Sequence, residues 1–520
     1  MLNVSEGWKA AHKEMLLPET FIEINYRISE PGLQESASIT VVGQESFSGL
    51  PETHAVESEK YSTLEWNAWG LDGSFEYFDG SPNSPGYVTT TMSGADAAYS
   101  VYPKITLDFG SVHTAIIPGV TICWSEAFDE WASSFKITVY NGTSVVAQKV
   151  VTGNTSHITT AWIEYQNFNK VVVEVLEWCL PYRRSRTMCV FAGIEATYRK
   201  TDLLGFTHSH NVDLLSAALP KSELTFQLDN SDDRWNPSNP QGAEQYLMER
   251  QKVTLRYGMI VDGKTEWVNA DTLWISEWNT PTNGLSATFT ARDAVQFMEE
   301  TYTGPSSGTL YSVAEAAFSH ISMDGGIVEY YIDNSLKSIQ CDFSDDDGEY
   351  TVSNILQMVA HAGCCVMYSD HDGAVHIEPR EYAMSDYEIG QDVSYSYPEF
   401  NMSKPLKAVS VTYGDKTVVV NAGSTGEVQT VSNELIGSDA VAKSVANAAI
   451  GVLTNRKTIS GEYRADPRLD ALDVITVHNK YATNTVVVTD ITLSTTGGAL
   501  RGSYTGRVID DGRGVFGIST

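Results

Sequence analysis

Residues 221–300 constrain the fold of this chain more than any other stretch. Apolar and polar residues alternate in four runs within it, as they do in half-buried β-strands. In the first run, Phe226 and Leu228 share one face. The dipeptides Asp262-Gly263 and Asn283-Gly284 favour hairpin turns, because both accept positive φ. The stretch therefore predicts a small antiparallel barrel, closed by a short helix that begins near its end.

The same residues resemble a known family. The sequence LTFQLDNSDDRWNP, followed by VTLRYG and TFTARDAVQFM, resembles the first domain of phage tail hub proteins, the baseplate hub or tail-tip minor structural proteins of tailed phages and prophages. YSDHDGAVHIEPRE is similar to the next domain of that family, and ADPRLDALDVITV with GGALRGSYTGRV is similar to its closing barrel. Once one insertion is removed, the resemblance covers most of the chain. It implies a mainly β fold with a few helices, built from hub-type β-barrel domains and an α+β domain.

The insertion has a pattern of its own. Short predicted strands with turns between them follow one another from Lys104 to Tyr198, and this spacing indicates a β-sandwich. The region from ITLDFG to VVVEVLEW resembles a discoidin or galactose-binding-like jelly roll, a module type that often binds sugars through loops at one end. A compact module whose ends lie close together can be inserted at a loop without disturbing a barrel.

The predicted organisation has four units. Residues 1–53 and 199–304 form a split hub β-barrel domain, whose first strands are expected at residues 21–28 and 39–42. Residues 54–198 form the inserted sandwich, residues 305–403 the α+β hub domain, and residues 404–520 a C-terminal barrel with one helix. The capping residues Ser5 and Ser438, together with apolar periodicity, predict helices at 4–16, 312–321, 351–362 and 438–453.

The charge balance limits the possible partners. The chain has 34 basic and 66 acidic residues, a net charge of −32. Gripping a phosphate backbone needs clustered Lys and Arg, so specific nucleic-acid binding is not expected. An acidic lumen would still let DNA pass, and the alternative reading is that the charge serves solubility alone. The N-terminus lacks the apolar run of a signal peptide, so we expect synthesis in the host cytoplasm and incorporation into the virion.

Two motifs with possible chemistry are better explained structurally. GMIVDGKT, from Gly258 to Thr265, matches the phosphate-loop pattern, but that mechanism needs a helix after the loop. The alternating residues that follow predict a strand, so we interpret the motif as a hairpin. His208 and His210 share a strand face, yet no third ligand is evident. We expect them to form a polar strand face or a subunit contact, and we expect no metal and no cofactor.

The six cysteines show no zinc spacing and no disulfide framework. Cys179 and Cys189 could pair across a hairpin, but free buried thiols are favoured in a protein made in the cytosol. HExxH is absent, GPSSG at residues 304–308 matches GxSxG but falls at a junction between two predicted domains, and acidic pairs without a fixed separation do not define a glycosidase. The chain is therefore not expected to be an enzyme.

The inserted sandwich carries the best candidate binding surface. Aromatic faces stack on sugars, and Arg offers a planar set of donors to hydroxyls or carboxylates. PYRRSR is the one dense basic cluster, and we expect it to be an exposed loop between two strands. The alternative is that most of the tryptophans pack in cores. The candidate carbohydrate-binding residues are Trp66, Trp69, Trp124, Trp131, Tyr182, Arg183 and Arg184.

Together these patterns favour a structural role over chemistry. The resemblance implies a homotrimeric ring joined to the sixfold ring of the distal tail protein, in contact with the tape measure protein and other tail-tip or fibre proteins. The inserted module would face a host cell-surface glycan. The alternatives are a carbohydrate-binding adhesin without a hub role and, less favoured, a glycan hydrolase.

Overall fold

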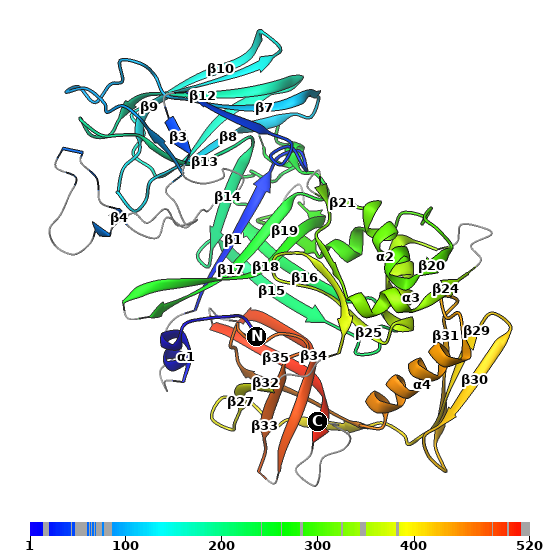
Figure 1. The fold of residues 1–520 in the computed structure, drawn as a ribbon. Coiled ribbons are helices and arrows are strands. Elements are labelled where there is room, and N and C mark those ends of the chain that lie inside the picture. Colours follow the sequence, from blue (N-terminus) through cyan, green and yellow to red (C-terminus); the bar gives the residue numbers. More distant parts are fainter. Residues whose placement is uncertain are drawn as a thin grey trace.

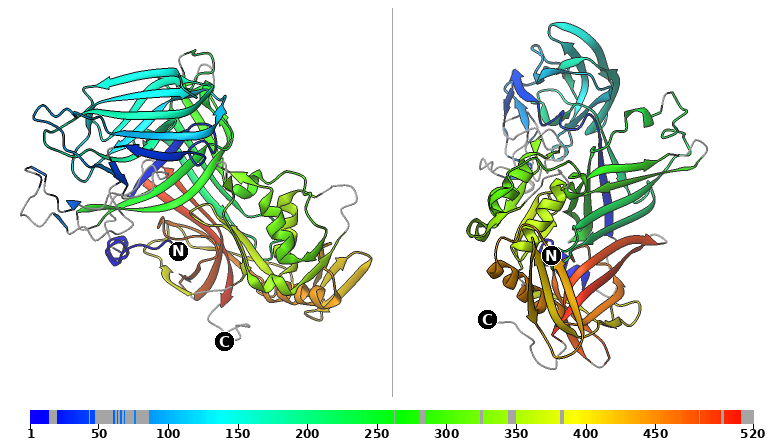
Figure 2. Two further views of the ribbon diagram at one scale, coloured as in Figure 1. Left: turned by 45° about the horizontal axis from the view of Figure 1, so that its top comes forward. Right: turned by 90° about the vertical axis from the view of Figure 1, so that its right-hand side faces the viewer.

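The computed structural model describes residues 1–13, 20–42, 44–46, 60–61, 63, 65–66, 68, 75–76, 86–240, 242–261, 263–280, 284–323, 326–343, 350–380, 384–480, 482–496 and 499–510. The chain is mainly β, as predicted. A β-sandwich lies at one end of the molecule and the C-terminal strands lie at the other (Figure 1). In the two further views the sandwich again adjoins the first β-domain, on the side opposite the C-terminal strands (Figure 2).

Seven strands form the first β-domain, in the order β14-β1-β17-β18-β19-β16-β15. Their bounds are β1 Thr20–Ile28, β14 Ile194–Arg199, β15 Leu203–Asn211, β16 Lys221–Asp229, β17 Lys252–Val261, β18 Lys264–Asn279 and β19 Ser286–Arg292. The predicted alternation is confirmed, since Leu224, Phe226 and Leu228 are buried along β16. Phe226 stacks on Phe289 with ring centroids 5.2 Å apart, and the edge of Trp235 packs on Phe289. The short helix after β19 is a 3₁₀ helix, η2 Ala294–Phe297; another, η1 Glu244–Tyr246, precedes β17.

The sandwich consists of two five-stranded sheets, β10-β9-β12-β7-β2 and β11-β8-β13-β6-β3. Their bounds are β2 Ser38–Val42, β3 Gln44–Ser46, β6 Tyr87–Thr89, β7 Lys104–His113, β8 Ile117–Trp124, β9 Ala132–Asn141, β10 Ser144–Thr152, β11 Ile158–Tyr165, β12 Phe168–Trp178 and β13 Arg186–Phe191. The inward residues of the two sheets, such as Leu107, Ile137 and Ile122, form one buried core. A small two-stranded sheet, β4 Lys60–Tyr61 and β5 Phe75–Glu76, also lies in this part of the sequence.

Two strand assignments at the edges of the insertion were wrong. Residues 39–42 were expected in the barrel, but β2 pairs with β7 of the sandwich, Ser38 opposite Asp108. Residues 190–198 were expected to form one strand, but the chain changes sheets at Gly193, whose φ is 154°. A side chain there would meet the carbonyl oxygen of Ile28 at 2.7 Å. The described strands of the sandwich thus run from β2 at Ser38 to β13 at Phe191, so they begin before the predicted bound of 54 and end before that of 198.

The α+β unit packs around two helices. Its elements are β20 Ser307–Thr309, α2 Leu310–Ser319, β21 Ser322–Met323, β22 Gly326–Ile327, β23 Tyr330–Ile332, η3 Asn334–Ser338, β24 Gln340–Asp342, α3 Val352–Ala362, β25 Cys365–Ser369 and β26 Val375–Pro379. Helices α2 and α3 begin with reciprocal capping hydrogen bonds at Thr309 and Thr351. None of the helices among the described residues is long and apolar enough to span a membrane.

The predicted boundary at residue 404 does not separate two cores. The next elements are β29 Leu406–Tyr413, β30 Lys416–Asn421, β31 Glu427–Ser432 and α4 Asp439–Leu453. Val411 and Ala446 from this segment share one buried core with Phe318 of α2 and Val359 of α3. The strands and the helix up to Leu453 therefore extend the α+β unit, although sequence had assigned them to the closing barrel.

The last β-domain contains the remaining strands. They are β27 Met384–Ile389, β28 Glu399–Met402, β32 Lys457–Arg464, β33 Val474–His478, β34 Thr483–Thr496 and β35 Ala499–Asp510. Strand β15 of the first β-domain pairs antiparallel with β34, so the two β-domains form one 13-stranded sheet. Near the N-terminus, α1 Glu6–His12 is capped by Ser5 as predicted and buries Trp8. The last residues of that predicted helix, 14–16, lie outside the described residues.

The phosphate-loop match is a hairpin. Val261 at the end of β17 lies opposite Lys264 at the start of β18, with Gly263 at φ 80° in the turn between them. Strand β18 then continues to Asn279, so the helix that would hold a phosphate is replaced by a strand. The interpretation of this motif as a turn is confirmed.

Candidate functional site

The predicted sugar-binding residues of the sandwich fall into different environments. Trp66 and Tyr182 are exposed, at 68% and 44%. Trp124 is 2% exposed, and its ring lies 5.8 Å from that of Trp178 in an edge-to-face contact within the core. Trp131 is half-buried, with its ring edge-to-face against His157. Trp124 therefore belongs to the core, and its assignment to a binding face was wrong.

Trp69 lies outside the described residues.

The basic cluster lies between strands β12 and β13, as predicted, and its Tyr182 is exposed, but Arg183 and Arg186 are buried and not exposed as expected. The side chain of Arg186 has no exposed surface and forms ion pairs with Glu65 and with Glu130. Its guanidinium lies 3.9 Å from the centre of the Phe128 ring. Arg183 is also buried and places its Nε 2.8 Å from Glu130 Oε1. These two arginines are structural, because buried guanidinium groups need such partners.

Electrostatics within this cluster bind the segment at residues 65–66 to the sandwich. Burial raises the pKa of Glu130, whose Oε2 accepts a hydrogen bond from Trp178 Nε1 at 2.8 Å. Burial would raise the pKa of Glu65, but the guanidinium of Arg186 and the hydrogen bonds from Arg184 N–H and Thr63 together outweigh burial and lower the pKa of that carboxyl. Arg183 donates a further hydrogen bond to the backbone carbonyl of Trp66.

The anchored segment leaves an exposed apolar patch on the sandwich. Ser93 N donates to the carbonyl of Arg183 at 2.8 Å, and Ser93 Oγ donates to that of Leu180 at 3.0 Å. Four residues of the segments that these contacts join have exposed side chains, and we name them the aromatic patch: Trp66, Met92, Leu180 and Tyr182. Arg184, half-buried, lies at its edge, and its backbone N–H donates to Glu65 Oε1 at 2.6 Å.

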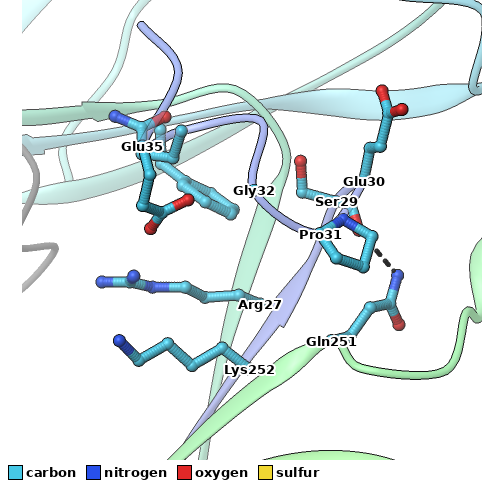
Figure 3. Close-up of a pocket in the computed structure, with 10 residues that line it drawn as sticks. Arg27, Ser29, Glu30, Pro31, Gly32, Glu35, Gln251 and Lys252 are labelled. Carbon is cyan, nitrogen blue, oxygen red and sulfur yellow. Dashed lines mark hydrogen bonds between the residues drawn. The ribbon is translucent and has the colours of Figure 1, made fainter. Parts of the chain in front are cut away.

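A small cavity marks the junction between the first β-domain and the sandwich (Figure 3). Arg27 and Lys252 extend side by side into it, and Glu35 lies above Arg27. Gln251 Nε2 donates to the carbonyl of Ser29 at 3.0 Å, the dashed contact in the figure. The cavity is thus bounded by hydrogen bonds that hold the point where the chain enters the sandwich, and we interpret it as structural.

A second polar cluster lies inside the first β-domain. His208 and His210 on β15 point at Asp271 on β18, and all three are buried. The distance between the two Nε2 atoms is 2.8 Å, and Asp271 Oδ2 lies 3.2 Å from His208 Nε2 and 3.0 Å from His210 Nε2. We name these residues the His-Asp cluster. Asp271 supplies the third possible metal ligand, which the sequence did not reveal.

The His-Asp cluster connects three parts of the molecule. His210 Nδ1 lies 2.9 Å from Asp470 Oδ1 in the last β-domain. The other oxygen of Asp470 lies 3.0 Å from Nε2 of His371, in the turn between β25 and β26. His371 Nδ1 in turn contacts the carbonyl of Ala270 at 2.5 Å. The cluster therefore lies where the two β-domains and the α+β unit meet.

The ionisation of the cluster follows from these contacts. Burial lowers the pKa of His208, and the neighbouring His210 lowers it further. Burial also disfavours charge on His210, but the carboxylates of Asp470 and Asp271 outweigh it and hold the pKa of His210 well above its usual range. Burial would raise the pKa of Asp271, yet the hydrogen bonds from both histidines lower it. A positive charge at the centre of this cluster is thus favoured.

The fold and these sites define a class: a mainly β, multidomain protein with a sandwich inserted in its first β-domain. No protein-family model matches the chain, and no curated protein matches it either. Among solved structures, it is similar to the 43 kDa tail protein of prophage MuSo2 from Shewanella oneidensis. That pair has 11% sequence identity and a TM-score of 0.43, over 60% of this chain and 95% of that one.

Two further solved structures are similar to the chain. A tail protein from Neisseria meningitidis has 9% identity and a TM-score of 0.43, over 61% of this chain and 94% of that one. Prophage tail protein gp18 from Listeria monocytogenes has 11% identity and a TM-score of 0.38, over 60% and 91%. The solved structures that the chain resembles thus include phage and prophage tail proteins.

Proposed function

We propose that this protein is a structural tail hub protein of a tailed phage or prophage-derived particle, assembled as a ring at the tail tip or baseplate. The observation that carries the proposal is the continuous sheet. Five residue pairs between β15 and β34, from Thr207 with Ser494 to Asn211 with Asp490, join the two β-domains edge to edge. This strand pairing holds the two β-domains together as one rigid unit, and a load-bearing part of a tail requires such rigidity. The resemblance of LTFQLDNSDDRWNP and ADPRLDALDVITV to hub proteins falls on these same two β-domains.

The number of β-domains suits the expected partners. A homotrimer of this chain would present six β-domains, the number that a sixfold ring of distal tail protein requires. The tape measure protein or DNA would occupy the lumen. With a net charge of −32, the chain would repel DNA and would not bind it. Other tail-tip or fibre proteins would attach on the outside.

The sandwich is the proposed host-contact module. It lies at the end of the molecule opposite the last β-domain (Figure 1). Within it, the aromatic patch offers the exposed rings of Trp66 and Tyr182, which can stack on the C–H faces of a sugar. Arg184 at its edge can donate to hydroxyl or carboxylate groups, while buried Arg183 holds the backbone of Trp66 in place. Glycan binding by this module would serve a hub and a free adhesin equally well.

Ring assembly is tested with a shortened chain that lacks the sandwich but keeps the two β-domains and the α+β unit. Ile28 and Ile194 lie directly opposite each other on paired strands, so a two-residue Asn-Gly turn can replace residues 29–193. We expect both the full chain and this shortened chain to form threefold rings, alone or with distal tail protein, when measured by light scattering and electron microscopy. Monomers in both settings would rule out the hub role.

Glycan binding is tested separately on the full chain. The variant Trp66→Ala/Tyr182→Ala should lose binding on an array of bacterial wall glycans, whereas Trp162→Ala should keep it. Trp162 is the matched control, because it is 46% exposed on β11 of the same sandwich but is not part of the aromatic patch. A full chain that binds glycans but never forms rings would favour the adhesin, and equal binding by all variants would place the glycan site elsewhere.

A further inference from the structure

The two histidines of the His-Asp cluster are held so that their Nε2 atoms face each other. The outer nitrogen of each ring has its own partner: His208 Nδ1 lies 3.1 Å from the Tyr257 hydroxyl, and His210 Nδ1 lies 2.9 Å from Asp470 Oδ1. A carboxylate only accepts hydrogen bonds, so His210 either carries a hydrogen on both nitrogens and donates to Asp470 and Asp271, or is neutral with the hydrogen on one of them. In the neutral form with the hydrogen on Nδ1, its Nε2 carries a lone pair that points at His208 Nε2 and Asp271 Oδ2.

This arrangement places electron-rich atoms against one another. With the hydrogens on both Nδ1 atoms, two nitrogen lone pairs and one carboxylate oxygen converge within 3.2 Å. The side chains of these three residues are nearly inaccessible to solvent, with exposed fractions of 6%, 9% and 1%. Burying such a set without a cation is unfavourable. The occupant is either a proton shared at His210 or a metal ion bound by all three residues.

The outer contacts are those that support a metal ligand. A metal-binding histidine usually donates its other ring N–H to a carboxylate or another acceptor, which fixes the tautomer and the ring orientation. Asp470 does this for His210, and the Tyr257 hydroxyl can do it for His208. Ser222 Oγ donates to Asp271 Oδ2, which fixes the carboxylate.

The spacing also fits a small divalent ion. Bonds of about 2.0–2.2 Å to nitrogen and oxygen in a tetrahedral site place the ligand atoms roughly 3.3 Å apart. The three distances here are 2.8, 3.0 and 3.2 Å, so the side chains need to move outward by only a few tenths of an ångström. A cavity of about 10 Å³, lined in part by His208, His210 and Asp470, adjoins the cluster. That is roughly the room one water molecule needs.

We propose that His208 Nε2, His210 Nε2 and Asp271 Oδ2 bind one divalent first-row transition metal ion of the zinc class, with a water molecule from the adjoining cavity as fourth ligand. Two imidazoles and one carboxylate are a donor set that such ions favour. Because Asp470 and His371 hold the site from the last β-domain and the α+β unit, the ion stabilises the junction of three parts of the molecule. This inference is independent of the proposed hub role.

The experiment uses the full chain, purified without a histidine tag, stripped with chelator and then titrated with Zn²⁺. We expect about one zinc ion per chain by elemental analysis. The melting temperature should rise by roughly 3 °C or more when zinc is added well above its dissociation constant. Co²⁺ in place of Zn²⁺ should give the visible absorption of a four-coordinate site, and anomalous scattering from crystals should locate the ion between His208, His210 and Asp271.

Two variants and one control test whether His208 and Asp271 bind the ion. His208→Gln and Asp271→Asn should reduce zinc to well under one ion per chain and abolish the zinc-dependent rise in melting temperature. His478→Gln should behave like the unaltered chain, since His478 is partly exposed and pairs with Glu388 in the last β-domain. If a cluster variant fails to fold, the cobalt spectrum and the anomalous signal of the unaltered chain still decide.

A folded, chelator-treated chain that takes up neither Zn²⁺ nor Co²⁺ would overturn the proposal and leave a shared proton at the centre of the cluster. Zinc retained at one ion per chain in both His208→Gln and Asp271→Asn would also overturn it.

Discussion

Thr207 of β15 lies directly opposite Ser494 of β34, and the four residue pairs that follow them continue the ladder between the two β-domains. Backbone hydrogen bonds therefore cross from one domain to the other, which an ordinary domain interface lacks. The sandwich is attached differently, through the two chain passages next to Ile28 and Ile194 and through side-chain contacts such as that of Tyr246 with Glu164. This contrast has a consequence for how the molecule unfolds.

We expect the two β-domains to unfold together and the sandwich to unfold as a separate unit, because cooperativity follows shared strands and shared cores. Ile137→Ala removes a buried side chain from the sandwich core and should destabilise only that unit, by about 2–5 kcal/mol. Phe289→Ala, in the core of the first β-domain, should lower only the unfolding temperature of the two β-domains. Calorimetry of both variants measures this, and a single transition that moves in both would contradict it.

Local patterns were enough to predict the elements that depend on neighbouring residues. The alternation around Phe226 and the turn at Gly263 both appear where the sequence indicated them. The caps Ser5 and Ser438 also begin their helices as expected, because a cap is a contact within one turn.

Partners that come from distant residues could not be predicted in the same way. The run SITVV alternates equally well for either sheet, so nothing local assigns β2 to the sandwich. PYRRSR appeared exposed because its partners Glu65 and Glu130 lie far away in sequence. Asp271 looked like an ordinary polar position on a strand, and only the curvature of the sheet brings it to His208. The aromatic patch depends on the same long-range contacts.

Replacing Arg186 should be among the most damaging changes in the sandwich. Arg186→Met fills a similar volume but leaves Glu130 with one arginine partner and takes the ion pair from Glu65, both in buried positions. Leaving buried charge uncompensated costs about 3–5 kcal/mol. Chemical denaturation of the sandwich transition measures the loss. Arg184→Ala is the control and should cost less than about 1 kcal/mol, because the contact of Arg184 with Glu65 is made by its backbone N–H. Equal losses of stability in the two variants would show that the ion pairs of Arg186 do not stabilise the sandwich.

Alanine substitutions at two residues of the phosphate-loop match, Lys264 and Gly258, should differ in their effect on stability. Lys264 is exposed at a hairpin, so Lys264→Ala should leave the melting temperature and assembly unchanged. Gly258 lies under the ring of Trp267, and a methyl group there would meet that ring at 2.7 Å. Gly258→Ala should therefore destabilise the chain by about 1–3 kcal/mol. Binding of a labelled nucleotide that disappears in Lys264→Ala would reverse the hairpin interpretation.

The stability of the sandwich should depend on pH through Glu174. Burial would raise its pKa, but Lys104 and Lys136 on the neighbouring strands outweigh burial and lower it. Because the folded pKa lies below the unfolded value of about 4.3, the contribution is present above that value and is lost as pH falls through the folded pKa. Both lysines are partly exposed, so it amounts to about 1 kcal/mol or less.

Glu174→Gln should therefore be less stable than the unaltered chain at pH 7, and the difference should shrink steadily as pH falls from about 5 to 3. Thermal melts of the sandwich transition across that range measure it. Glu177→Gln is the matched control, because Glu177 lies exposed on the same strand, β12. It should differ little from the unaltered chain at every pH. A difference for Glu174→Gln that grows toward low pH would mean that the lysines do not stabilise its charged form.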